Sequence, residues 1–220
     1  KSGASVISAG KLDITGDLTV TETEADGIYT YTAQALPALE GAEVFTADTI
    51  PEAGKTYYLT DDVTLSKVTY LRGGDYTIYL DGHTLSGKTA PYLVVGSTED
   101  HESTLTICDR TADFGRVLGQ TAGADEMILV YGKLTLTGGD LTGHTNTDSS
   151  SGDGGAIKVY AGGTFEMTGG RITDNTAKTG GGVFVRRGSF TMYDGTISNN
   201  TTSGYVGGGG VYVQFTDAFT

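Results

Sequence analysis

Cysteine, proline and tryptophan are scarce in this chain. Its 220 residues include one cysteine, three prolines and no tryptophan. With Cys108 alone no intrachain disulfide can form, which excludes a small domain held together by disulfides. The hydrophobic fraction of 37% excludes a disordered low-complexity chain, because such sequences are poor in residues that can pack. The fold must therefore be held by an apolar core, and we expect Cys108, in TLTICD, to face that core as a small hydrophobe.

Basic residues are also few. Lysine and arginine number 14 against 27 acidic residues, which gives a formal net charge of −13. Such a field repels nucleic acid and anionic membrane surfaces, so neither is expected as a partner. No apolar run approaches the ~20 residues of a membrane span, so no membrane insertion is expected. An acidic surface fits a protein exposed outside a cell.

Glycine is the residue in excess. The chain has 35 glycines, about twice the usual share, together with 13 tyrosines and 7 phenylalanines. Glycine turns with many threonines and aromatics are typical of short strands joined by tight corners.

Internal repeats explain this composition. The segments GGAIKV from Gly154, GGGVFV from Gly180 and GGGVYV from Gly208 superpose with offsets of 26 and 28 residues. A second block follows the first two, as GTFEMTGGRITDNTA from Gly163 and GSFTMYDGTISNNTT from Gly188, and GKLTLTGGDLTGHT from Gly132 is the same unit. Repeats of this length indicate a solenoid.

Apolar residues alternate within each block, with Phe165 and Met167 matching Phe190 and Met192. Period two places them on one face of a short strand. A unit this small cannot enclose its own core, whereas stacked copies can. We therefore predict an all-β fold, a right-handed parallel β-helix (solenoid) with rungs of about 25–30 residues and excursion loops. Its inward columns are expected to be Ile157 over Val183 over Val211, and Val159 over Val185 over Val213.

Corner positions carry glycine and asparagine. Gly138–Gly139 and Gly169–Gly170 can supply the positive φ that a sharp corner requires. Asn175 and Asn200 fall at equivalent positions, with His144 in the same slot one repeat earlier. We expect a structural ladder there, because side-chain amides can cap turn backbone groups.

The repeats GGAI and GGGV, alternating with ITDNTA and ISNNTT, resemble those of bacterial surface and secreted parallel β-helix proteins. They are similar to the GGA(I/L/V) and FxxN repeats of chlamydial polymorphic membrane proteins, with Ile172 and Ile197 in place of the phenylalanine. They are closer to β-helix adhesin-like proteins of gut Gram-positive bacteria, through YYLTDDVTL from Tyr57, DGHTLSG from Asp81 and DGTISNNTT from Asp194. The resemblance covers roughly residues 51–220. It implies an extracellular or cell-surface bacterial protein, often adhesive.

Three parts are expected along the chain. Residues 1–20 are predicted to form a β-helix rung or N-terminal cap, and 51–220 the parallel β-helix, which stops in mid-rung. Residues 21–50 break the repeat and are expected to be an excursion or small lateral subdomain, with a short helix near 33–39 as one option. Residues 109–124 are expected to form a second long corner. The open end favours a fragment of a longer protein over a subunit that assembles end to end into a filament.

A carbohydrate-active enzyme of the pectate-lyase type is the runner-up function. It needs a pair of carboxylates, or clustered carboxylates that hold Ca²⁺. The outward columns expected here are Thr135, Glu166 and Thr191, and Asp140, Arg171 and Thr196, and neither contains two carboxylates. Asp61–Asp62 and Asp81 with His83 are interpreted as turn residues. No catalytic residue, metal or cofactor is therefore expected.

A binding surface is the favoured interpretation. The outward residue of the first strand in successive repeats is Lys158, Phe184 and Tyr212. Two exposed stacked aromatics above a lysine suit a sugar ring or a protein contact, unless a loop such as 203–206 covers them. We predict an adhesive module that binds a host-surface glycan or protein. Ice binding through threonine ladders is disfavoured, because the Thr-x-Thr pairs do not recur at equivalent positions.

Overall fold

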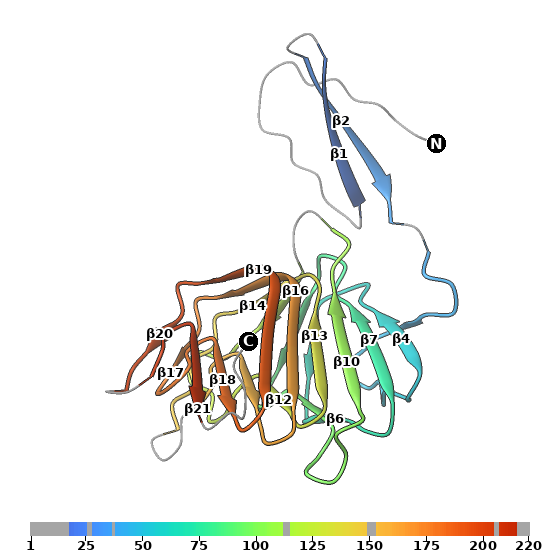
Figure 1. Ribbon diagram of the computed structural model, residues 1–220. Coiled ribbons are helices and arrows are strands. Elements are labelled where there is room, and N and C mark those ends of the chain that lie inside the picture. Colours follow the sequence, from blue (N-terminus) through green and yellow to red (C-terminus); the bar gives the residue numbers. More distant parts are fainter. Residues whose placement is uncertain are drawn as a thin grey trace.

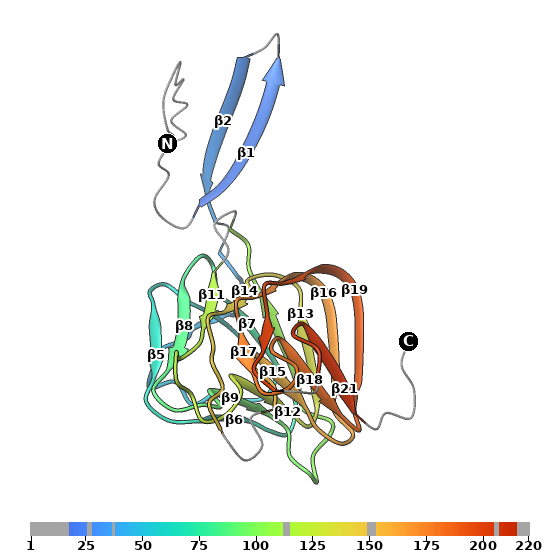
Figure 2. The same cartoon turned by 90° about the vertical axis from the view of Figure 1, so that its left-hand side faces the viewer.

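The computed structural model describes residues 18–25, 28–36, 38–111, 115–148, 153–204 and 207–214. In these ranges the chain forms strands and no helix, and all strands beyond residue 42 pair in parallel. The architecture is the predicted right-handed parallel β-helix, seen from two sides in Figures 1 and 2. The scarcity of proline and the excess of glycine thus serve short strands and sharp corners.

One wall of the β-helix is a six-stranded sheet in the order β21-β18-β15-β12-β9-β6. Its strands, in chain order, are β6 (Thr69–Leu71), β9 (Leu93–Val95), β12 (Ile128–Val130), β15 (Ile157–Val159), β18 (Val183–Arg186) and β21 (Val211–Gln214). Rung lengths vary more than expected, since Leu93 follows its partner Thr69 by 24 residues and Ile128 follows Leu93 by 35.

The other two walls are joined into one eleven-stranded sheet because two long strands bend round a shared corner. One wall holds β3 (Glu43–Val44), β4 (Lys55–Tyr58), β7 (Asp75–Tyr79), β10 (Thr104–Cys108) and β13 (Lys133–Leu136). The other holds β5 (Val63–Leu65), β8 (Thr84–Gly87), β11 (Arg116–Leu118) and β14 (Asp140–Thr142). The strands β16 (Thr164–Thr173) and β19 (Ser189–Ser198) continue both walls, and a small pair, β17 (Thr176–Ala177) with β20 (Thr201–Thr202), lies beyond them.

The core is built of the predicted columns. Ile157 pairs with Val183, which pairs with Val211, and all three face the interior. On the neighbouring wall the rings of Phe165 and Phe190 stack with centroids 4.9 Å apart. Identical side chains meet in these columns because parallel strands pair in register.

The predicted glycine corner is confirmed. Gly139 and Gly170 have φ values of 87° and 76°, which side chains with a Cβ rarely adopt. At Gly169 the constraint is space, since a Cβ there would lie 2.4 Å from the carbonyl oxygen of Thr137 on the rung below. Each glycine therefore lets a rung turn directly over its neighbour.

The asparagine ladder is also confirmed. Buried Asn175 donates from Nδ2 to the carbonyl oxygen of Leu141 (2.9 Å) and to Oδ1 of Asn200 (3.0 Å). Its own Oδ1 accepts the backbone N–H of His144 (3.0 Å). The side chains thus satisfy corner backbone groups that no strand partner reaches.

The N-terminal boundaries differ from the prediction. Strands β1 (Leu18–Ala25) and β2 (Ile28–Ala35) form an antiparallel hairpin that stands away from the β-helix (Figure 1). Residues 18–20 therefore belong to this hairpin and to no rung, and residues 1–17 lie outside the described part. No helix occurs in the described residues near 33–39. The β-helix begins at β3, before residue 51, where buried Phe45 packs edge-on against Tyr57 at 5.7 Å.

The expected corner at 109–124 is also wrong in part, because β11 lies inside it and pairs with β8 and β14 as a regular rung strand. At the C-terminal side of the described chain, Met192 is 42% exposed although its column partner Met167 is buried.

Candidate functional site

The three predicted binding residues do form one column on the outer face of the six-stranded sheet. Lys158 pairs with Phe184, and Phe184 with Tyr212. The two rings stack with centroids 5.8 Å apart, and Nζ of Lys158 lies 5.9 Å from the centre of the Phe184 ring. Phe184 is only 1% exposed, however, so the expectation of two exposed aromatics is wrong for this residue.

Glycine turns lie against this part of the column. A Cβ on Gly154 would lie 3.2 Å from Cβ of Lys158, and a Cβ on Gly180 would lie 3.0 Å from Cα of Phe184. The turn before each strand therefore folds back onto the outward residue of that strand. The covering segment 203–206 considered from sequence includes residues 205 and 206, which lie outside the described residues.

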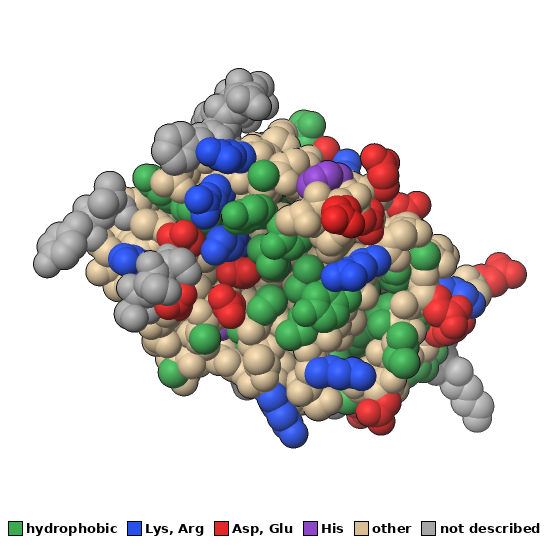
Figure 3. Space-filling view, turned by 90° about the horizontal axis from the view of Figure 1, so that it is seen from below, with side chains coloured by type: hydrophobic (Ala, Val, Ile, Leu, Met, Phe, Trp, Pro, Cys, Tyr) green, Lys and Arg blue, Asp and Glu red, His purple; other side chains and the backbone are tan. Residues whose placement is uncertain are grey.

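The same outer column continues into the earlier rungs. It runs from Lys158 through half-buried Leu129 and buried Val94 to Tyr70, which is 55% exposed. Here the surface is hollowed into a pocket of about 430 Å³. Figure 3 looks onto this wall and shows hydrophobic side chains gathered at its middle with charged groups around them. The pocket is lined by Val68, Tyr70, Arg72, Pro91, Val94, Gly96, Ser97, Thr98, Asp125, Glu126, Leu129 and Tyr131.

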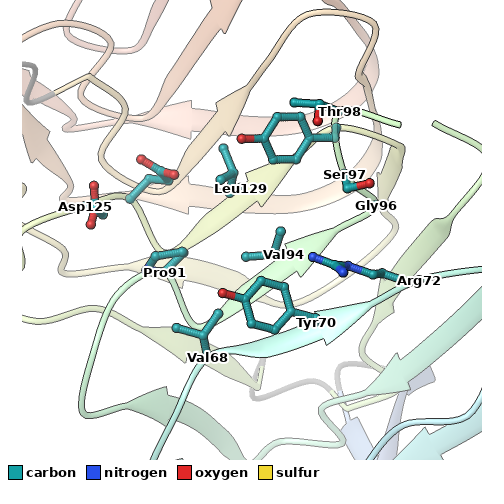
Figure 4. Close-up of a pocket in the computed structure, with 12 residues that line it drawn as sticks. Val68, Tyr70, Arg72, Pro91, Val94, Gly96, Ser97, Thr98, Asp125 and Leu129 are labelled. Atoms are coloured by element: carbon teal, nitrogen blue, oxygen red, sulfur yellow. The ribbon is translucent and has the colours of Figure 1, made fainter. Parts of the chain in front are cut away.

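The close-up in Figure 4 shows how the labelled residues divide the pocket. Tyr70, Val94 and Leu129 come from three adjacent strands and form its apolar floor. Arg72 and the hydroxyl residues Ser97 and Thr98 lie on one side, and Asp125 lies on the other. An apolar floor between polar groups is the usual composition of a small-molecule site.

A second set of outward residues lies at the C-terminal ends of these strands. Arg72, Tyr131 and Tyr160 directly follow β6, β12 and β15, and Arg186 is the last residue of β18. The guanidinium of Arg72 lies 5.0 Å from the centre of the Tyr70 ring, and that of Arg186 lies 5.6 Å from the Tyr160 ring. Tyr131 and Tyr160 meet edge to face at 5.4 Å. Aromatic faces with fixed cations thus extend from the pocket along the wall.

Glu126 is the unusual charged group of the pocket. Burial raises the pKa of its carboxyl to about 7, and the positive charge of Lys158 partly opposes this rise. The nearby charges of Asp125 and Asp153 favour the protonated form. Glu126 therefore exchanges its proton near neutral pH, as hydrogen-bonding or proton-transferring carboxyls do.

The loop that carries Asp125 and Glu126 is folded around His144. The backbone N–H of Gln120 donates to Nδ1 of His144 (3.1 Å), and Nε2 lies 2.5 Å from the carbonyl oxygen of Asp125. Burial lowers the pKa of His144, although its bond to the carbonyl of Asp125 and the Asp125 charge oppose this effect. The neutral ring of His144 therefore supports the loop that carries Asp125 and Glu126.

The other sequence candidates hold turns. Oδ1 of Asp62 accepts the backbone N–H of Thr84 (2.7 Å), and Asp61 is exposed beside it. Buried Asp81 has a φ of 49° and forms a two-contact ion pair with Arg110. His83 follows it in the turn and donates its backbone N–H to Leu80 (2.9 Å).

Cys108 does not face the core as expected. Ile107 takes the inward position, and Cys108 lies in the outward column beside Tyr79. Burial raises the pKa of its thiol. A raised pKa lowers the thiolate fraction that a reactive cysteine needs.

The predicted outward columns are confirmed by the register. Glu166 lies between Thr135 and Thr191, and Arg171 lies between Asp140 and Thr196. The Arg171 guanidinium lies 3.3 Å from Asp140, and Lys133 binds Glu166 at 2.8 Å. Within the described ranges no three side chains of His, Cys, Asp or Glu are grouped as a metal ion would require.

The register agrees with the expectation that Thr-x-Thr pairs do not recur, although single threonines do recur at one equivalent position. Thr77, Thr106 and Thr135 form a single ladder on adjacent strands, continued at one end by Thr56. The ladder ends at Glu166, which is paired with Lys133. The flanking positions of the same rungs are Asp75, Thr104 and Lys133, so no flat second ladder accompanies it.

The sequence did contain a signal for the pocket residues. The register aligns Ile128 with Ile157, so Asp125 and Glu126 occupy the places of Gly154 and Gly155. In the same way Pro91 and Val68 stand in turns that are glycine-rich in later rungs. Loss of the glycine pair therefore marks the rungs whose residues line the pocket.

No helix in the described part of the chain is long and apolar enough to cross a membrane.

Comparison with known proteins found no protein-family model, curated protein or solved structure that matches this chain.

Proposed function

We propose that this chain is an adhesive, glycan-binding module that holds its ligand on the outer face of the six-stranded sheet. The observation that carries the proposal is the exposed ring of Tyr70, which stands at a pocket of about 430 Å³ with the guanidinium of Arg72 at 5.0 Å. The pocket replaces the Phe184 region as the contact, because Phe184 is buried.

The chemistry of the pocket suits a sugar. One face of a pyranose ring is apolar and packs on an aromatic ring, while the hydroxyl groups at its edge need donors and acceptors. Tyr70, Val94 and Leu129 supply the apolar surface, and Arg72 and Asp125 supply hydrogen-bonding groups on opposite sides (Figure 4). The tyrosines that follow β12 and β15 offer further stacking positions for a chain of sugars.

An extracellular or cell-surface bacterial location belongs to the same proposal. Its supports are the resemblance of the repeats and the net charge of −13. A rigid wall of stacked rungs is a suitable carrier for a repeated contact, although the β-helix fold itself does not fix a function.

A glycan-array screen of the whole chain, with and without Ca²⁺, tests the proposal. Tyr70→Ala and Arg72→Ala should abolish binding, while Tyr193→Ala is the matched control, because Tyr193 is 71% exposed on a different wall. Binding that survives both pocket variants, or no binding to any glycan, would contradict it. In the second case a protein-binding stalk or a filament subunit becomes the better account.

A polysaccharide lyase or hydrolase is the second candidate, and Glu126 is the observation that favours it. A carboxyl with a pKa of about 7 can act as a general acid near neutral pH, and Asp125 provides a second carboxylate at the same pocket. Incubation with polysaccharides and detection of new reducing ends or unsaturated products tests this. Activity lost in Glu126→Gln would favour the enzyme, and unchanged polymer would favour the adhesive module.

A further inference from the structure

The loop from Gly119 to Glu126 touches His144 at two glycines. A Cβ on Gly119 would lie 2.3 Å from Cα and Cβ of His144, and one on Gly123 would lie 2.3 Å from Cε1 of its ring. Both distances are too short for any side chain. The backbone of the loop is therefore wrapped closely around this histidine.

The two ring nitrogens of His144 hold the two ends of that loop. Nδ1 accepts the backbone N–H of Gln120 at 3.1 Å, so the ring proton of the neutral form must lie on Nε2. Nε2 then donates to the carbonyl oxygen of Asp125 at 2.5 Å. The next residue, Glu126, lines the pocket. Both nitrogens are satisfied in one tautomer only.

Protonation of Nδ1 is incompatible with this arrangement, because two N–H donors would then face each other. The groups around the ring offer limited compensation. The Asp125 carboxylate and carbonyl favour the cation, whereas Gln120 and the buried Asn175 are neutral. Burial outweighs them and lowers the pKa of His144 below 6.5. The stabilising contribution is therefore complete above pH 6.5 and is lost as the pH falls through the lower folded value.

We propose that His144 is a pH-sensitive latch, which in its neutral form closes the loop 119–126 and in its protonated form releases it. Release removes Asp125 and Glu126 from their places at the pocket. The consequence for ligand binding rests on the proposed function, whereas the latch itself is a property of the ligand-free loop. Once a glycan ligand is known, its affinity should fall about tenfold as the pH falls through the midpoint of the His144 titration, as expected for an unsatisfied buried donor.

The first test needs no ligand. Hydrogen exchange of the whole chain, corrected for intrinsic rates, is followed by NMR together with the ring resonances of its three histidines. The amide of Gln120 should lose protection with the same midpoint as the His144 ring, while the core amide of Val159 stays protected. Protection of Gln120 that is constant through the titration of His144 would overturn the latch.

Two variants sharpen the test. The side chain of His144→Gln can accept and donate hydrogen bonds as the neutral ring does but does not titrate. The amide of Gln120 in this variant should therefore keep the same protection above and below the wild-type midpoint. His101→Gln is the control, because Nδ1 of exposed His101 lies 2.7 Å from the carbonyl oxygen of Tyr131 at the same pocket. If His101→Gln abolished the pH dependence of loop protection, the effect would come from His101, and the proposed role of His144 would be wrong. If His144→Gln does not fold, the wild-type titration still decides.

The experiments distinguish failure of the latch from failure of the proposed function. Loop opening without any glycan binding supports the latch and contradicts the proposed function. A glycan that binds equally above and below the midpoint of the His144 titration contradicts the regulation and leaves the proposed function in place.

Discussion

The outer column of the six-stranded sheet has one half that lines the pocket, here called the open half (Tyr70, buried Val94 and Leu129), and one half outside it, here called the closed half (Lys158, Phe184 and Tyr212). The register makes the two halves equivalent, since each residue is paired with the next along the sheet. Their surroundings are not equivalent. Tyr70 is exposed at a pocket, whereas Phe184 is buried between a lysine and a tyrosine.

The difference arises in the turn before each strand. In the closed half this turn is glycine-rich and lies close against the column, as at Gly154 and Gly180. In the open half the corresponding turns carry Val68, Pro91, Asp125 and Glu126, whose side chains form the sides of the pocket. The repeat motif that reveals the β-helix is thus the feature that closes its wall, and the site lies where the motif is lost.

Truncation of Phe184 should have the largest effect on stability. Phe184→Ala is expected to lower the free energy of unfolding by about 3–4 kcal/mol, because it leaves a cavity in a packed environment. Tyr70→Ala should cost less than about 1 kcal/mol, because its ring is largely solvated. Urea denaturation of both variants measures the difference. Equal losses would mean that the two halves do not differ in packing.

The carboxyl of Glu126 should make stability depend on pH. Its pKa is raised from 4.5 to about 7, so its contribution is complete below pH 4.5 and is lost as the pH rises through 7. The loss is at most about 3 kcal/mol. Denaturation of wild type and Glu126→Gln at each pH isolates it, because both proteins keep His144. If the difference in the free energy of unfolding between the two proteins did not change with pH, the raised pKa of Glu126 would be refuted.

For ligand binding, in contrast to stability, substitutions in the open half should have the larger effect. With a glycan identified on the array, Tyr70→Ala should weaken binding about tenfold or more through lost stacking. Tyr212→Ala should leave it within about twofold, because its ring packs on Phe184 outside the pocket. Calorimetric titration gives both values. A larger effect at Tyr212 would move the site back to the closed half.

The smallest predicted effect tests the link between the halves. Lys158 lies over Phe184, and its charge lowers the pKa of Glu126. Lys158→Met should therefore raise the pKa of Glu126 by up to about one unit. An NMR titration of the Glu126 carboxyl carbon detects this shift. Lys133→Met is a suitable control, since Lys133 pairs with Glu166 on another wall. If the pKa of Glu126 were unchanged in Lys158→Met, the two halves would have no electrostatic coupling.

The sequence by itself determined the β-helix, its inward columns and its corners. The period-two pattern at Phe165 and Met167, the glycine pair at Gly169–Gly170 and the amide of Asn175 recur in successive repeats, so comparing the repeats along the chain identifies them. The same reasoning brought Lys158, Phe184 and Tyr212 into one column, because register follows directly from the repeat.

Only the tertiary structure decided which outward residues are exposed. Burial of Phe184 depends on turns and side chains of neighbouring rungs, and the pocket joins Tyr70 of β6 to Glu126 and Tyr131, which flank β12. The raised pKa of Glu126 likewise arises from desolvation by distant segments, and the loop is held on His144 by two hydrogen bonds between segments far apart in the sequence. Periodicity fixes which way a side chain points, whereas solvent exposure depends on what the rest of the chain places above it.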